Sequence, residues 1–239
     1  MELKAKSLFI TGTDTNVGKT FICALLLGFL RDYGIDVGYQ KWVSTGGDEP
    51  EDLLFCLRNT GQEFDRRELE MQVPYRFLFP ASPHLSSEQE GKGIDPEFIV
   101  QRFHEYSRGK ELLLVEGVGG LMVPLRRDLL LADFMARFKM PTLIVARSGL
   151  GTLNHTFLTI EALRSRNIPI LGVVFSDEKS GMAPDDLLVA DNMQTIAEMG
   201  KVSVFGRLLR YDSFEDARRA FQAIGTSILS VCRNGGVEE

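Results

Sequence analysis

Short apolar segments alternate with longer amphipathic segments along the chain, so strands and helices are expected in turn. The segment 112–115 is apolar without interruption, as in a central parallel strand that helices cover on both faces. Regular alternation of this kind predicts an α/β fold, a doubly wound and mostly parallel sheet with helices on both faces. The expected strands span residues 7–11, 37–41, 112–115, 142–146, 170–175 and 202–205. The expected helices span residues 19–32, 52–58, 96–107, 129–138, 153–166, 185–199 and 214–231.

The segments between these elements are rich in proline and glycine. A loop is expected over 44–50, and residues 62–94 are expected to be irregular because prolines and glycines break any long element. Residues 62–80 and 178–184 carry no recognisable motif. The chain shows no internal repeat, low-complexity tract or linker, so a single domain over residues 1–239 is expected.

Composition narrows the class of protein without defining it. The chain has 239 residues, of which 44% are hydrophobic and 25% charged, and this balance excludes a disordered chain. The formal net charge of −6 argues against general affinity for nucleic acid, because a binding face needs a basic excess. The three cysteines are odd in number and far apart, which favours a reducing compartment over a disulfide framework.

Targeting and membrane segments are not expected either. The first apolar stretch is too short for a signal peptide. The longest mostly apolar stretch, residues 21–30, is too short to span a bilayer. The sequence therefore predicts a cytoplasmic protein with neither a nucleic acid nor a membrane as partner.

A glycine-rich loop, Gly12–Thr20, lies between the first expected strand and the first expected helix. A phosphate-binding loop needs this arrangement, since its backbone N–H groups and the N-terminus of the following helix face the anion. In such a loop Lys19 would reach the terminal phosphates, and the Thr20 hydroxyl would help to hold Mg²⁺. Five residues, instead of the usual four, separate Gly12 from Gly18. The strand–loop–helix context nevertheless predicts a nucleotide site.

Charged side chains lie at the ends of two other expected strands. Glu116 comes directly after the third strand, at the carboxyl end where open α/β sheets bind ligands, and glycines follow it. Glu116 is therefore a candidate Mg²⁺ ligand, and Asp52 is a second. The position of Asp52 is equally typical of an acidic residue that stabilises a helix N-terminus. Lys41 ends the second strand at the same sheet edge, where it would stabilise a developing phosphoryl or carboxylate charge. Thr45, in the following turn, would add a hydroxyl group.

Five segments of the chain form an ordered set, at residues 12–20, 38–46, 82–91, 115–125 and 150–159. The phosphate loop among them is shared by many families, whereas the Ser-Pro-His segment at 82–84 and the Gly-Thr-Leu-Asn-His segment at 151–155 are much more specific. Together and in this order, the five segments resemble those of dethiobiotin synthetases, the ATP-dependent cyclo-ligases of biotin synthesis, which have the fold of P-loop NTPases.

The resemblance implies a defined reaction. Diaminopelargonic acid takes up carbon dioxide as a carbamate, and ATP phosphorylates the carbamate to a carbamic-phosphoric anhydride. The second amine then closes the ureido ring of dethiobiotin, with release of ADP and phosphate. The resemblance also implies ATP and Mg²⁺ as cofactors, and a homodimer in which a helix of the partner subunit completes the substrate site.

The same resemblance implies roles for individual residues. Lys41 and Lys19 would be catalytic, stabilising the charge of the carbamate and of the transferred phosphoryl group. Thr20, Asp52 and Glu116 would bind Mg²⁺. Substrate contacts would come from Thr15, Lys41, Thr45, Gly151, Thr152 and Asn154. Nucleotide contacts would come from Asn16, Val17, Gly18, Lys19, Thr20, Phe21, Glu116, Gly117, Val118, Gly119, Ser176 and Asp177.

The chain departs from the family's pattern at several positions. Asn16 stands where the family often has glutamate, Trp42 stands where proline is usual, and Ser176 replaces the asparagine of an Asn-Asp pair near the adenine. These departures leave open a related P-loop ligase that acts on another amine or carboxylate. A nucleotide-switch protein of the partitioning type is a third alternative, but it would carry an extra lysine early in the loop, where this chain has Asp14 and Asn16.

Overall fold

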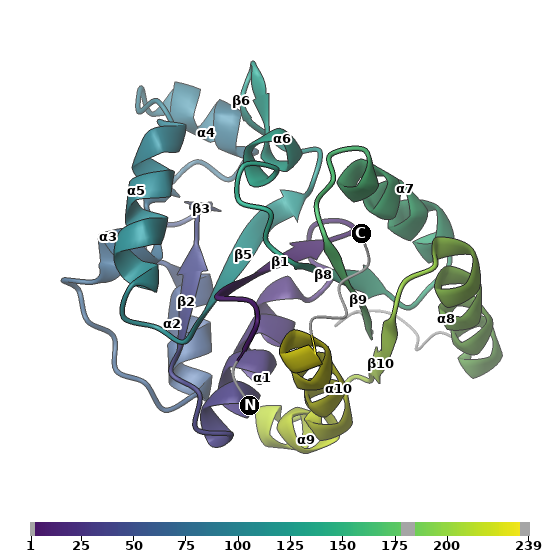
Figure 1. The fold of residues 1–239 in the computed structure, drawn as a ribbon. Coiled ribbons are helices and arrows are strands. Elements are labelled where there is room, and N and C mark those ends of the chain that lie inside the picture. The colour runs from purple at the N-terminus through teal and green to yellow at the C-terminus, as the bar shows by residue number, and fades with distance from the viewer. Residues whose placement is uncertain (1–2, 178–184, 235–239) are drawn as a thin grey trace.

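A computed structural model describes residues 3–177 and 185–234, which are arranged around a central β-sheet (Figure 1). Six parallel strands form this sheet in the order β10-β9-β8-β1-β5-β2. The chain winds from β1 to one side and then to the other, which confirms the predicted doubly wound fold and creates a switch point beside β1. The strands are β1 (Ser7–Gly12), β2 (Val37–Lys41), β5 (Leu112–Gly120), β8 (Thr142–Arg147), β9 (Ile170–Ser176) and β10 (Val204–Leu208).

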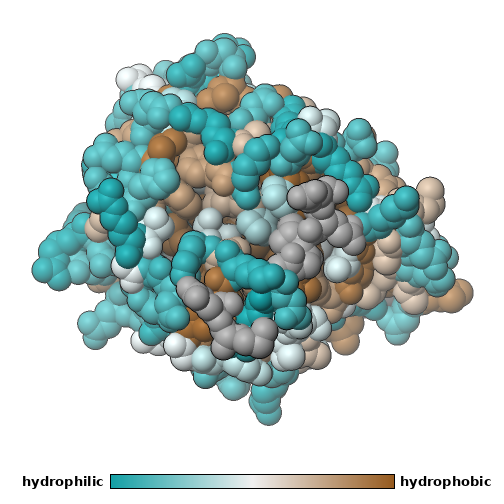
Figure 2. All heavy atoms as spheres, viewed as in Figure 1, coloured by the Kyte–Doolittle hydropathy of each residue, from teal (hydrophilic) through white to brown (hydrophobic). Residues whose placement is uncertain are grey.

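Helices cover both faces of the sheet, and hydrophilic residues predominate on the molecular surface seen in Figure 2. Along β5, Leu112 and Leu114 point into one hydrophobic cluster, and Leu113 and Val115 point into another, because successive strand residues face opposite sides. The first cluster contains side chains from α1 (Lys19–Asp32), α2 (Glu51–Asn59), α9 (Phe214–Ala220) and α10 (Gln222–Asn234). The second contains side chains from α5 (Pro96–Ser107), α6 (Leu131–Met135), α7 (Thr152–Arg164) and α8 (Asp186–Gly200).

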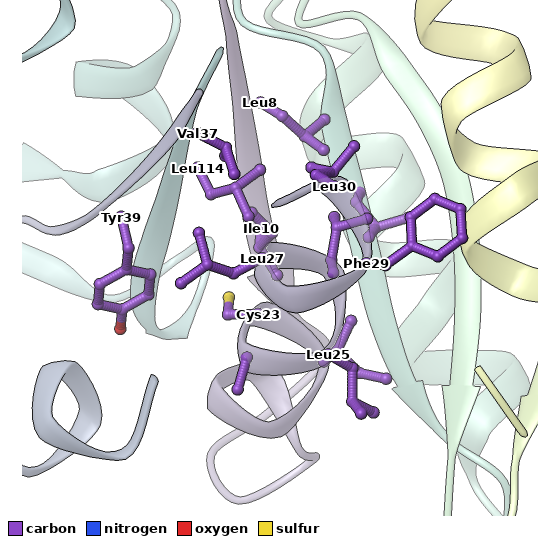
Figure 3. Packing of buried hydrophobic residues seen from close by; sticks show 14 of the residues in the cluster. Leu8, Ile10, Cys23, Leu25, Leu27, Phe29, Leu30, Val37, Tyr39 and Leu114 are labelled. Atoms are coloured by element: carbon purple, nitrogen blue, oxygen red, sulfur yellow. The ribbon is translucent and has the colours of Figure 1, made fainter. Parts of the chain in front are cut away.

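Helix α1 is buried between the sheet and α10. Figure 3 shows Leu27 of α1 beside Ile10 and Leu114 of the sheet, with which it shares the first hydrophobic cluster. On the opposite side, a Cβ on Gly225 of α10 would lie 2.7 Å from ring atoms of Phe29, so glycine is needed for this close approach. Packing on both sides holds α1 in place, and the phosphate loop lies at the N-terminus of this helix.

The segment 62–94 is not irregular, so that prediction is wrong. It contains α3 (Leu69–Gln72), β4 (Tyr75–Phe77) and α4 (Pro83–Gln89). The expected loop 44–50 also begins inside a strand, β3 (Val43–Thr45), which pairs in parallel with β4. Contacts between distant segments stabilise these short elements, and a local pattern of prolines and glycines does not reveal such contacts.

Two strands of the sheet extend further than the apolar pattern predicts. The pattern ends β5 at residue 115, whereas the strand runs to Gly120, which pairs with Gly12 at the end of β1. Glycines in this part of β5 let it pass close to the phosphate loop. Glu116 therefore lies inside β5 and not directly after it. The strand predicted over 202–205 is β10, which begins at Val204 and ends at Leu208.

Two of the predicted helices are divided or replaced. Residues 129–138 contain strand β7 (Leu129–Leu130), which pairs with β6 (Pro124–Arg126), and only the short helix α6 after it. Residues 214–231 form α9 and α10, which meet at Phe221, a ring that is buried in the first hydrophobic cluster. The other predicted strands and helices are confirmed to within two residues at each end. Over the described ranges, no helix has an apolar stretch long enough to span a bilayer.

Candidate nucleotide and catalytic site

The phosphate loop Gly12–Thr20 is folded tightly between β1 and α1. Asn16 and Gly18 have φ angles of 62° and 93°, in the left-handed region that asparagine and glycine tolerate best. The Lys19 ammonium donates a 2.8 Å hydrogen bond to the carbonyl of Asp14 and so closes the loop. Among the described residues no side chain caps α1, so its first N–H groups face the loop, where an anion would bind.

Four polar side chains meet beside this loop. The Lys41 ammonium lies 2.9 Å from Oε1 of Glu116 and also pairs with Oδ2 of Asp52. The Thr20 hydroxyl lies 2.8 Å from the same Oε1 and 2.8 Å from Oδ1 of Asp52. The Glu116 side chain is 0% exposed and the Lys41 side chain 10% exposed. Residues that the sequence singles out separately as catalytic or metal-binding thus form one cluster, which we call the Lys41 cluster.

Each member of the Lys41 cluster is supplied by a different element. The register of the parallel strands places Lys41 of β2 directly opposite Glu116 of β5. Asp52 lies in the first turn of α2, and Thr20 lies in the first turn of α1. Parallel strands end at one edge of the sheet and the helices that follow them begin there, so residues far apart in sequence meet.

Burial and charge act in opposite directions on the ionisable groups of the cluster. Burial alone would lower the pKa of Lys41, but the carboxylates of Glu116 and Asp52 outweigh burial and raise this pKa. Burial alone would raise the pKa of Asp52, but the Lys41 ammonium outweighs it and lowers this pKa. Burial lowers the pKa of Lys19, an effect that Glu116 opposes. Lys41 and Asp52 therefore form an ion pair at neutral pH.

A tyrosine that the sequence motifs do not single out also contacts the Lys41 cluster. The Tyr39 hydroxyl donates a 2.7 Å hydrogen bond to Oε2 of Glu116. Burial, and then the charge of Glu116, raise the pKa of Tyr39 well above its ordinary value, so the phenol keeps its proton. Strand alternation would have given the signal, because Tyr39 precedes Lys41 by two residues and so lies on the same face of β2.

Two cysteines lie close to the cluster, Cys23 on α1 and Cys56 on α2. Burial, and then the charge of Glu116, raise the pKa of both thiols well above the ordinary value. Both cysteines are free and buried, as is Cys232 on α10. They therefore pack as neutral thiols.

The oxygen atoms of the Lys41 cluster have the chemistry and spacing that Mg²⁺ requires. Mg²⁺ prefers an octahedron of oxygen ligands at about 2.0–2.1 Å, which places neighbouring ligands about 2.9 Å apart. The Thr20 hydroxyl lies 2.8 Å from one oxygen of Asp52 and one of Glu116, yet has a single hydrogen to donate. Within the described ranges no three His, Cys, Asp or Glu side chains gather to hold a metal. The donor set therefore fits Mg²⁺ that also binds phosphate or water oxygens.

The residues predicted to lie near the base are at the end of β9. Ser176 touches the phosphate loop, since its Oγ lies 2.7 Å from where a Cβ on Gly18 would be. Both oxygens of the Asp177 carboxylate pair with Arg207 of β10, at 2.8 and 2.9 Å. The sequence does not single out Arg207, which looks there like an ordinary surface arginine. Residues 178–184, for which the sequence gives no motif, lie outside the described residues.

The predicted segment Gly117–Gly119 borders the loop from β5. A Cβ on Gly117 would lie 2.9 Å from the ring of Phe9, and a Cβ on Gly119 would lie 3.8 Å from the Thr15 hydroxyl. Thr15 therefore faces this glycine-rich part of β5. The other predicted contact residues in this region are exposed Asn16, buried Val17, and partly buried Phe21, Thr45 and Val118.

The residues predicted to hold the substrate carboxylate lie elsewhere, at the N-terminus of α7. Gly151 is the N-cap of this helix with a φ of 89°, Thr152 is buried and Asn154 is exposed. Helix α7 packs against β8 and α8, whereas the Lys41 cluster is carried by β2, β5, α1 and α2. Within the described part of one chain, these residues therefore lie on different elements from those that carry the Lys41 cluster.

The parallel sheet, the phosphate loop and the Lys41 cluster together define a P-loop nucleotide-binding protein. Residues 6–217 match the family described as an AAA domain. The MinD cell division protein of Aquifex aeolicus is similar in structure, with a TM-score of 0.55 and 16% identity over 96% of each chain. The pNOB8 ParA protein bound to nonspecific DNA has a TM-score of 0.57 and 14% identity over 96% of this chain and 99% of its own. At these identities the likeness to these two structures extends to the fold alone.

Sequence relatives specify the family further. The ATP-dependent dethiobiotin synthetase BioD of Rhodopseudomonas palustris strain BisB5 is 41% identical over 84% of this chain and 84% of its own length. The protein of the same name from Methanocaldococcus jannaschii is 33% identical over 87% of this chain and 96% of its own length. The chain therefore belongs to the dethiobiotin synthetase family, as the sequence motifs indicate. It is an ATP-dependent ligase that forms C–N bonds.

Proposed function

We propose that this protein makes dethiobiotin for biotin biosynthesis from diaminopelargonic acid, carbon dioxide and ATP. The family relationship supports this reaction, because relatives that align with most of the chain are named ATP-dependent dethiobiotin synthetases. The single observation that carries the proposal is the Lys41 cluster, a buried ammonium held between two carboxylates beside a phosphate loop.

The proposed reaction forms and breaks bonds in three steps. One amine of diaminopelargonic acid attacks carbon dioxide, loses a proton and becomes a carbamate. A carbamate oxygen then attacks the terminal phosphorus of ATP, and ADP leaves. The second amine attacks the carbonyl carbon of the resulting carbamic-phosphoric anhydride, the C–O bond breaks, and phosphate leaves as the ureido ring closes with loss of a second proton. Negative charge lies on the carbamate or the phosphoryl group throughout.

The two lysines would stabilise this charge from different sides. Lys19 lies at the phosphate loop. Among the described residues its ammonium has one hydrogen-bond acceptor, the Asp14 carbonyl, so it would be able to follow the transferred phosphoryl group. Lys41 lies across from Glu116 at the sheet edge and would contact the carbamate. Preorganised charges of this kind act strongly because the site is largely buried.

Thr20, Asp52 and Glu116 would hold Mg²⁺. When bound, this ion supplies positive charge to the phosphate oxygens of the nucleotide. The Lys41 ammonium already pairs with both carboxylates, so the protein itself provides a cation where these carboxylates would otherwise repel each other. Hard oxygen donors in this number are what Mg²⁺ uses beside phosphates.

The substrate would bind between two subunits of a homodimer. Thr15 and Thr45 would contact it from one subunit, and the N–H groups of Gly151, Thr152 and Asn154 would hold its carboxylate from the partner. Two exposed leucines support this arrangement. Leu158 of α7 is 62% exposed and lies on the same helix face as Asn154, four residues earlier, and Leu150, just before the helix, is 83% exposed. Large exposed apolar side chains next to a binding residue favour an interface.

The nucleotide would lie along the phosphate loop with its base toward β9 and β10. Ser176 and Asp177 border that region, and the Arg207 guanidinium neutralises the Asp177 carboxylate. We expect ATP to be the nucleotide, in keeping with the names of the relatives. A location in the cytoplasm and a single domain over residues 1–239 stay predictions.

The test is turnover by the purified protein. Diaminopelargonic acid, bicarbonate, ATP and Mg²⁺ should yield a ureido product with one ADP and one phosphate per product molecule, detected by mass spectrometry and phosphate release. Protein that binds ATP normally but yields no ureido product would contradict the proposal. Phosphate release with a different amine or carboxylate would then identify a related ligase.

A further inference from the structure

The carboxylate of Glu116 is divided between two sets of partners. Its Oε1 faces the site, where the Thr20 hydroxyl lies at 2.8 Å and the Lys41 ammonium at 2.9 Å. Its Oε2 faces the interior and accepts the 2.7 Å hydrogen bond from the Tyr39 hydroxyl. Because the Glu116 side chain is 0% exposed, bulk water cannot take the place of Tyr39 as a donor to Oε2.

Tyr39 is itself held firmly. It is 1% exposed and belongs to the first hydrophobic cluster, together with Cys23, Leu27 and Leu114, as Figure 3 shows. A packed ring fixes the position of its hydroxyl oxygen, and that oxygen in turn fixes the plane of the Glu116 carboxylate. This orientation directs Oε1 toward Thr20.

We propose that Tyr39 is a positioning residue that sets the affinity of the site for a divalent cation by orienting Glu116. The inference rests on the proposed function, because it places the cation among Thr20, Asp52 and Glu116. Removing a hydrogen-bond partner that orients a metal ligand typically weakens metal binding by about 10- to 100-fold. Tyr39 would touch neither substrate nor cation, so its effect acts through Glu116.

A purely structural role for Tyr39 makes a different prediction, and the chain offers a matched control. Tyr106 of α5 is also buried, in the second hydrophobic cluster on the other face of the sheet, and its hydroxyl accepts a 2.8 Å hydrogen bond from Gln72. Tyr39→Phe and Tyr106→Phe each remove one buried hydroxyl and keep the ring. Only Tyr39→Phe removes a donor to Glu116.

The experiment measures Mn²⁺ binding to the full chain in the presence of the nonhydrolysable ATP analogue adenylyl imidodiphosphate. The electron paramagnetic resonance signal of free Mn²⁺ gives the dissociation constant. Tyr39→Phe should weaken Mn²⁺ binding by about 10-fold or more, whereas Tyr106→Phe should leave it within about twofold of wild type. In turnover, Tyr39→Phe should raise the half-saturating Mg²⁺ concentration more than it lowers kcat at saturating Mg²⁺.

Folding and the proposed function are controlled separately. Thermal unfolding of the two variants without metal shows how much each lost hydroxyl destabilises the protein. Wild-type Mn²⁺ affinity in folded Tyr39→Phe, or an equal loss in Tyr106→Phe, would overturn the proposal and leave Tyr39 as a core residue. Failure of the proposed function would look different, since wild-type protein would then make no ureido product whatever the Mn²⁺ affinities.

Discussion

Lys41 lies directly across the β2–β5 register from Glu116, with its ammonium 2.9 Å from the carboxylate. The same ammonium pairs with Asp52, so one positive charge is shared between the two carboxylates that we propose as Mg²⁺ ligands. When these carboxylates hold Mg²⁺, both ion pairs would weaken and the Lys41 ammonium would be free to contact the substrate. The relationship therefore couples the proposed metal site to the proposed catalytic lysine.

Replacing Lys41 by alanine should abolish most turnover and spare nucleotide binding. Removing one preorganised charge stabiliser typically lowers kcat by about 100- to 1,000-fold. The dissociation constant of ATP, measured by calorimetry, should change modestly, because Lys19 remains at the phosphate loop. Lys19→Ala should impair both kcat and ATP binding.

A second readout for Lys41→Ala is Mn²⁺ binding, which should become tighter because the competing ammonium is gone. Lys110→Ala is the matched control. Among the described residues Lys110 forms one ion pair, with the exposed carboxylate of Asp36 at 3.3 Å. That control should change neither kcat nor Mn²⁺ affinity. Equal and mild effects of Lys41→Ala and Lys19→Ala would show that Lys41 behaves as a solvated lysine.

Trp42, which departs from the family's proline, should contribute to stability through a buried hydrogen bond. Its Nε1 donates to Oε1 of Gln40 at 3.0 Å, and its ring packs 5.0 Å from the ring of Phe134, centroid to centroid. Trp42→Phe would leave that Gln40 oxygen unpaired, which costs about 1–3 kcal/mol. Urea unfolding of the variant should show this loss in the free energy of unfolding.

The control for Trp42 is a double-mutant cycle with Gln40→Leu. If the hydrogen bond carries the effect, the loss from Trp42→Phe should shrink when Gln40 is already absent. An unchanged loss in that background would assign the effect to ring packing alone.

The strand–helix alternation and the phosphate loop could be predicted because both depend on local sequence. Apolar runs and periodic apolar positions report which faces are buried, and the order glycine-rich loop, lysine, threonine reports a strand–loop–helix unit. The segment 62–94 could not be predicted in this way. In α4, the buried Ser86 hydroxyl donates to the carbonyl of Phe79 at 2.8 Å and lies 3.2 Å from that of Ala81, so polar contacts replace the apolar pattern.

The same distinction holds within the candidate site. Lys41 ends one predicted strand and Glu116 directly follows another, so their meeting at one sheet edge follows from parallel topology. The sequence does not single out Tyr39 and Arg207, because the contacts that place them at the site involve partners distant in sequence, Glu116 for one and Asp177 for the other. A tyrosine inside a buried strand is expected to be a core residue, and an arginine on an edge strand is expected to lie on the surface.

Leu158, exposed on α7, should contribute to dimer formation. Leu158→Glu would place a charge in the proposed interface and should shift the protein toward monomer, as measured by analytical ultracentrifugation. Because the partner's α7 is proposed to complete the substrate site, the KM for diaminopelargonic acid should rise while ATP binding is retained. Leu187→Glu is the control, since Leu187 is 80% exposed on α8 and not on α7. A monomeric wild-type protein with full activity would contradict the arrangement.

Cys232 should make the protein less stable as the pH rises from about 9 to about 11. Burial raises the pKa of this thiol from 9.0 to about 11 in the folded chain. Between these values the unfolded chain has lost the proton that the folded chain keeps, so the free energy of unfolding falls as pH rises, by up to about 2–3 kcal/mol. Urea unfolding at pH 8, 9, 10 and 11 should therefore show a shallower decline in Cys232→Ala than in wild type. Parallel declines would mean that the thiol ionises equally in both states.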